Sequence, residues 1–141
     1  MDVALIRKRL KTEIDQARRT AAERRERSKT ATRAYATFLE EIAVPTFRHV
    51  ANVLRSESIP FEVQTPLDGV RLVSDRSRDD VIALELDATQ DPPQVMLSSM
   101  RTWGSRVLQT ERAVHERTAI ELITPEDVLD CLLEELRPWL A

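Results

Sequence analysis

The sequence predicts a single α+β fold: a long kinked N-terminal helix, an antiparallel meander sheet of five or six strands, and a C-terminal helix packed on that sheet. The hydrophobic pattern has helical spacing up to about residue 57, a period of two from Ile59, and helical spacing again after Thr124. The predicted strands follow one another through short polar turns, which favours an antiparallel meander over parallel crossovers. A chain of 141 residues suits one domain with one core.

The N-terminal helix is predicted from a stretch with no glycine and a single proline, Pro45, between residues 2 and 57. Alanine, arginine, glutamate and leucine dominate this stretch, and all four favour helix. Apolar or small side chains recur every three or four residues on one stripe: Val3, Ile6, Leu10, Ile14, Ala17, Ala21, Ala31, Tyr35, Phe38 and Ile42. The stripe is interrupted at Arg24 and Ser28. Because proline removes a backbone hydrogen bond, we expect a kink or break near residues 41–45.

Five segments are predicted as strands, at residues 60–65, 70–75, 81–88, 95–102 and 105–113, and residues 117–123 are the candidate for a sixth strand. The sequence PLDG at residues 66–69 predicts the first turn, because it has an early proline and a final glycine. A tight turn containing Trp103 and Gly104 joins the fourth and fifth segments.

The C-terminal helix has the clearest local signal. Thr124 is the expected N-cap, Pro125 takes the first helical position, and Glu126 and Asp127 place negative charge in the first turn. The stripe expected to face the sheet consists of Val128, Cys131, Leu132, Leu136 and Leu140. Pro138 is expected to distort the last turn.

Charge divides the chain unevenly. Residues 7–33 hold eleven Lys and Arg against four acidic residues, a local net charge of +7, whereas the remainder carries −10. This predicts a projecting basic helical segment at residues 1–33 and an α+β domain at residues 34–141. Such a helix is too long to lie wholly on a small core, and isolated helices are only marginally stable in water.

The preferred function is a non-enzymatic one: an oligomerising or partner-binding module that uses its N-terminal helix. The partner would be a second copy, forming a dimer or coiled coil, or another helical protein. The expected contact residues are Ile6, Leu10, Ile14, Ala17 and Ala21. The arginines expected to meet an acidic partner surface are Arg18, Arg19, Arg24 and Arg25.

Two alternatives remain. A small anionic ligand could bind the open face of the sheet through Arg71, Arg101 and Arg106. A nucleic-acid accessory role ranks third, because acidic residues interrupt the basic segment and no aromatic side chain lies within it to stack on bases. Membrane-surface binding is disfavoured, since Ala17 and Ala21 are too small to anchor a helix in lipid.

The sequence offers little for catalysis. The two histidines and the single cysteine, Cys131, show no metal-ligand or catalytic spacing, so no metal or cofactor is expected. Cys131 lies on an apolar stripe, which predicts a buried structural thiol. The lone cysteine and the absence of a secretory signal pattern lead us to expect a cytoplasmic protein.

Overall fold

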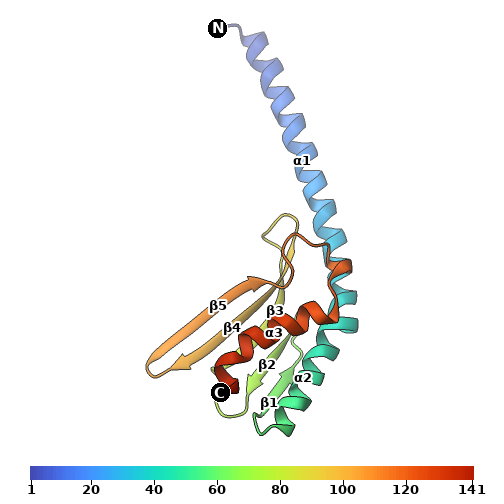
Figure 1. Cartoon of the computed structure of the whole chain (residues 1–141). Helices are drawn as coiled ribbons and strands as arrows, with labels where there is room; N and C mark the ends of the chain where they lie inside the picture. The colour runs from blue at the N-terminus through green and yellow to red at the C-terminus, as the bar shows by residue number, and fades with distance from the viewer.

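The computed structural model describes all residues, 1–141, as a two-layer α+β body from which one long helix projects (Figure 1). The N-terminal helical segments are α1 (Val3–Phe38), the π-helical turn η1 (Leu39–Ala43) and α2 (Val44–Ser56). The strands are β1 (Phe61–Gln64), β2 (Gly69–Ser74), β3 (Val81–Asp87), β4 (Gln94–Trp103) and β5 (Arg106–Ala113). The short 3₁₀ helix η2 (Ile120–Leu122) and α3 (Pro125–Leu140) complete the chain. The predicted α+β class is confirmed.

The sheet is an antiparallel meander in which the strands lie in sequence order, β1 to β5. The register sets Phe61 opposite Ser74, Ile82 opposite Ser99, and Ser99 opposite Thr110. Every connection is a turn or a short loop, and the β4–β5 turn contains Gly104 as predicted. Strands β1 and β5 are the two edges.

Both α2 and α3 cover the same face of the sheet (Figure 1). The core between the two layers is a single cluster of 20 buried residues, drawn from α1, α2, the sheet, the β5–α3 connection and α3. Its largest fully buried side chains include Phe47 of α2, Leu72 and Ile82 of the sheet, and Leu132 of α3. No helix covers the opposite face of the sheet, so that face is open.

The chain does not break at Pro45. Instead α1 passes through η1 into α2, and the N–H of Val44 donates to the carbonyl oxygen of Leu39. A wider turn of this kind is a common way for a helix to continue past a disturbance in its hydrogen-bond ladder. Pro45 lies in the first turn of α2, where a proline is tolerated.

The sixth predicted strand, at residues 117–123, is wrong. The chain turns at Arg117, whose φ is 55°, and then forms η2. Ile120 and Ile123 are buried, whereas Leu122 is 68% exposed. Because the segment crosses from β5 to α3 beside α1, its apolar side chains enter the core at a spacing of three rather than two.

The predicted start of α3 is confirmed. The side chain of Thr124 accepts from the N–H of Asp127, and the carboxylate of Asp127 accepts from the N–H of Thr124, which makes a complete capping box. The helix continues through Pro138 to Leu140, but Leu140 is 44% exposed and is not part of the buried stripe. Trp139 covers that end of the core instead, edge-on to Phe61.

Candidate interaction site on the free half of helix α1

The first 27 residues are exposed at every position, and burial begins at Ser28. We call residues 3–27 of α1 the arm. It spans about 37 Å at 1.5 Å per residue and leads straight away from the body (Figure 1). Asp2 is the N-cap of this helix, and its carboxylate accepts from the N–H of Ala4. The proposed boundary between residues 33 and 34 stays a prediction.

The arm carries an unusual amount of exposed apolar surface. Of the 15 large apolar side chains that are exposed in the whole chain, five lie in the arm: Val3, Leu5, Ile6, Leu10 and Ile14. Of the expected contact residues, Ile6, Leu10 and Ile14 are 40%, 55% and 45% exposed. Ala17 and Ala21 are also exposed. A contiguous apolar surface on a helix with no neighbour is typical of an interaction site.

Charged side chains follow this apolar row along one side. Val3, Ile6, Leu10 and Ile14 share a shallow groove with Arg7, Lys11, Asp15 and Arg18. At 100° per residue, Arg7, Lys11 and Arg18 lie on the same flank of the row. The arm therefore presents an apolar row with a predominantly basic flank.

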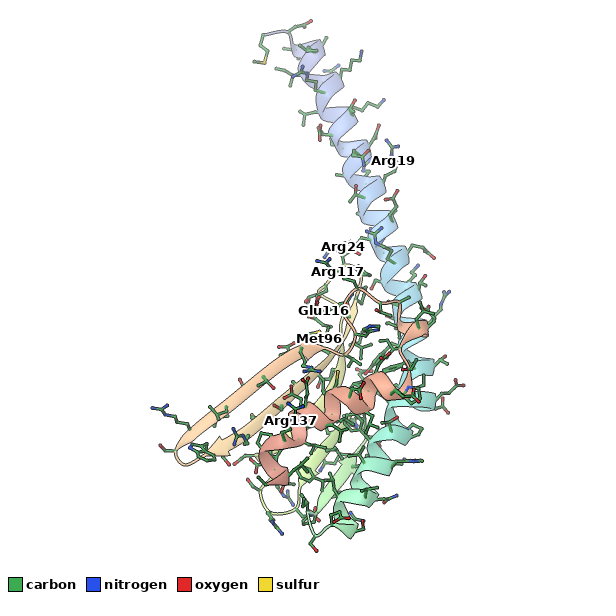
Figure 2. All side chains as sticks on the ribbon, in the orientation of Figure 1. Arg19, Arg24, Met96, Glu116, Arg117 and Arg137 are labelled. Atoms are coloured by element: carbon green, nitrogen blue, oxygen red, sulfur yellow. The ribbon has the colours of Figure 1, made fainter.

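The other arginines of the expected contact set differ in their surroundings. Arg18, Arg19 and Arg25 are exposed and form no ion pair within the chain. Arg24 Nε lies 4.0 Å from Asp91 Oδ2, at the junction of arm and body. Figure 2 shows Arg19 well away from the body and Arg24 near that junction.

One charged contact fixes the base of the arm to the β3–β4 loop. Arg27 donates from Nε and Nη2 to the two carboxylate oxygens of Asp91, at 2.8 and 2.7 Å. The hydrogen bond to Arg27, together with the positive charges of Arg27 and Arg24, lowers the pKa of Asp91. Beside this pair, Ala31, Pro93 and Ile120 help line a hollow of about 740 Å³ between α1 and the loops.

The arginines of the expected ligand face are not brought together. Arg71 follows the buried Val70 on β2 and therefore lies on the open face of the sheet. Arg101 and Arg106 are on the helix-bearing side, toward the end of the β4–β5 hairpin. The guanidinium of Arg101 lies over the ring of Trp103, 5.3 Å from its centroid. The principal hollows of the surface also lie away from the open face.

The sequence interpretation missed a groove in the helix layer. It is a hollow of about 350 Å³ between η1–α2 and the start of α3. Ile42, Val50 and Leu129 are its apolar lining, and Glu41 and Glu126 contribute acidic groups from opposite sides. We call this the α2–α3 groove. A second row of leucines on the terminal helix, Leu129 and Leu133, was the signal in the sequence that could have indicated it.

The groups considered for chemistry have structural partners. Cys131 is buried, as predicted, and donates to the carbonyl oxygen of Val114 at 3.2 Å. Asp80 accepts from Thr102 and from the indole N–H of Trp139, tying the sheet to α3. His115 Nδ1 lies 3.7 Å from Asp127 Oδ2. No group of three or more His, Cys, Asp or Glu side chains is arranged to hold a metal ion.

Comparison with known proteins identifies no relative: no family model matches the chain, and neither a curated protein nor a solved structure is detectably similar to it. None of the helices combines the length and the apolar character that crossing a bilayer requires. The fold and the exposed surfaces define the class to which the protein can be assigned: a two-layer α+β body with a projecting amphipathic arm.

Proposed function

We propose that this protein is a non-enzymatic association module, and that its arm binds a second copy of the chain through Ile6, Leu10 and Ile14. The observation that carries the proposal is the exposed apolar row on residues 3–14 of α1, where every residue is exposed and the helix projects away from the body (Figure 1). Ala17 and Ala21 extend this row toward the body and permit a close approach of a partner helix.

The marginal stability of an isolated helix supports the proposal that a partner binds the arm. A helix without tertiary contacts depends on intrinsic propensity, which is marginal in water even for good helix formers. Burying Ile6, Leu10 and Ile14 against a partner would stabilise the helix and remove apolar surface from water. The charges that flank the row would add register and partner selectivity rather than much affinity.

The test uses the full chain with one exposed apolar residue changed. Leu10→Asp places a charge in the middle of the row, where binding would bury it, so association should weaken by at least about tenfold. Multi-angle light scattering and sedimentation velocity over a concentration series measure the effect.

Thr12→Asp is the matched control, because Thr12 is two residues away on the far side of the same helix and is exposed. It should leave the association unchanged. A wild-type chain that remains monomeric throughout the concentration series would contradict the proposal, as would equal behaviour of the two variants.

A further inference from the structure

The α2–α3 groove and the arm are complementary surfaces that one chain cannot bring together. We propose that the arm of one copy lies in the α2–α3 groove of a second copy, and that two copies exchange their arms reciprocally. This inference rests on the proposed function and adds to it the surface on which the arm binds.

Charge is the first basis for this assignment. The flank of the apolar row on the arm carries Arg7, Lys11 and Arg18, whereas the groove has Glu41 on one side and Glu126 on the other. The same polarity holds for the chain as a whole, because the segment from residue 7 to 33 has a net charge of +7 and the rest has −10. Opposite potentials of this kind steer encounter and fix register.

Shape and apolar surface are the second basis. The groove lies between two helical segments and is lined by Ile42, Val50 and Leu129. One turn beyond Leu129, Leu133 is 46% exposed and continues the apolar surface along α3. An amphipathic helix binds such a groove with anchors spaced by about one turn, and Ile6, Leu10 and Ile14 have this spacing.

The geometry of α1 requires the groove to belong to another copy. The arm continues the same unbroken helix that packs on the body, and this helix directs it away from α2 and α3 (Figure 1). The segment also contains no glycine at which the chain could reverse. The arm therefore cannot reach the groove of its own chain.

Pairing of two arms with each other fits the charges less well. In an antiparallel pair, corresponding flanks face each other, so the basic flank with Arg7, Lys11 and Arg18 would face its own copy. In a parallel pair, Arg24 would oppose the Arg24 of the second copy at a position where the seam should be apolar. An arm bound in the α2–α3 groove avoids both the facing basic flanks and the opposed Arg24 side chains.

Reciprocal exchange also makes the interface larger. If a two-fold axis relates the copies, the same contact forms twice, and the two contacts stabilise one closed dimer. One helix in one groove would bury a modest area, and the doubling brings the interface closer to the range of stable protein pairs.

Two full-length variants test the arrangement by charge reversal. The arm variant carries Arg7→Glu and Lys11→Glu, and the groove variant carries Glu41→Lys and Glu126→Lys. All four residues are exposed. Each variant alone sets like charges against each other in both contacts, so we expect its dimer dissociation constant to rise by at least about tenfold.

The decisive measurement is the equimolar mixture. In a mixed pair, the acidic arm of the arm variant meets the basic groove of the groove variant, and the basic arm of the groove variant meets the unchanged acidic groove. Both contacts are then complementary, so the mixture should form a dimer at concentrations where each variant alone is a monomer. Sedimentation velocity measures this directly.

A control variant with Asp75→Lys and Asp79→Lys makes the same charge change on the exposed β2–β3 turn and should remain dimeric. Circular dichroism and thermal unfolding verify that each variant folds. If the groove variant does not fold, Glu41→Gln with Glu126→Gln replaces it and should give a smaller loss of association.

The outcomes separate the two proposals. If the arm variant dissociates but a folded groove variant dimerises like wild type, the arm binds elsewhere and only the present inference is overturned. The present inference is likewise overturned if the arm variant and the groove variant both dissociate and their mixture stays monomeric. If the wild-type chain never dimerises, or if Leu10→Asp has no effect, the proposed function itself fails.

Discussion

The two halves of α1 share one helix but not one environment. In the half next to the body, Tyr35 and Phe38 are 5% and 3% exposed and belong to the core. In the arm, every side chain is exposed. Neither half contains a glycine or a proline, so neither has a residue that would break the helix. The comparison shows that propensity accounts for the helix, whereas contacts account for where it lies.

The change from one environment to the other occurs where the sequence pattern is weakest. Arg24 and Ser28 occupy the two positions at which the apolar stripe is interrupted. In the structure, Arg24 approaches Asp91 of the β3–β4 loop, and Ser28 is the first residue of the helix that is partly buried. The interruption thus coincides with the junction of arm and body.

The largest expected effect contrasts the same substitution in the two regions. Leu72→Ala removes a fully buried side chain from the middle of the core and should lower the free energy of unfolding by about 2–5 kcal/mol. Leu10→Ala, in the arm, should change it by less than about 0.5 kcal/mol when the chain is monomeric. Urea unfolding of dilute protein, followed by tryptophan fluorescence, measures both. Equal losses would show that the arm is part of the cooperative body.

The second prediction concerns the anchor of the packed half. Tyr35 donates from its hydroxyl to the carbonyl oxygen of Asp68 at 2.7 Å. Burial, followed by the negative charges of Glu85 and Asp68, raises the pKa of Tyr35 above its ordinary value, which already keeps the hydroxyl protonated at neutral pH. Tyr35→Phe should cost about 1 kcal/mol of stability.

Thermal and urea unfolding at neutral pH measure the free energy of unfolding that Tyr35→Phe loses. The control Thr32→Ala removes an exposed hydroxyl from the same helix and should have a much smaller effect. If Tyr35→Phe is as stable as wild type, the hydrogen bond does not anchor α1 to the β1–β2 turn.

Much of this architecture could be predicted from the sequence because it depends on local patterns. The capped start at Thr124, the period of two in the strands and the turn at Gly104 are each determined by residues close together in the chain. The segment at residues 117–123 could not be predicted in this way, because its path depends on the distance it must cover between β5 and α3. Ile120 enters the core beside α1, which is distant in sequence.

The candidate site likewise combines features that the sequence predicts with features that it does not. The apolar row of the arm is a periodicity and can be read from the sequence, and its residues are exposed in the structure. The α2–α3 groove brings Glu41 and Glu126 to one surface from segments 85 residues apart, so the leucine row of α3 could indicate one wall of the groove, but no local pattern indicates that the two walls meet. Arg71 and Arg101 show the opposite case, because alternation along each strand did not reveal that they lie on different faces.

The third prediction compares the N-caps of two helices. Thr124→Ala removes the cap of α3, which packs on the core, and should cost about 1 kcal/mol of global stability. Asp2→Ala removes the equivalent cap of the arm. Because the start of the arm does not contact the body, loss of this cap should fray the first turn without changing the unfolding midpoint of dilute protein. Hydrogen exchange of residues 3–7, together with urea unfolding, distinguishes the two effects, and a shifted midpoint for Asp2→Ala would contradict the separation of arm and body.

The smallest effect concerns the ion pair at the junction of arm and body. The pKa of Asp91 is lowered by its hydrogen bond to Arg27, so the contact favours the ordered junction above the ordinary carboxyl value of about 4. This contribution is lost as the pH falls below that value and through the lowered pKa of Asp91. Both groups are on the surface, so global stability should barely change.

The measurable effect is local: amide exchange at residues 24–31 should increase at low pH relative to the exchange expected for an unprotected chain. Asp91→Asn should show the faster exchange at neutral pH and little pH dependence of its own. A side-chain carboxyl titration of Asp91 at its ordinary value would show that the contact with Arg27 does not persist in solution, and the arm would then be fixed to the body by the packing of α1 alone.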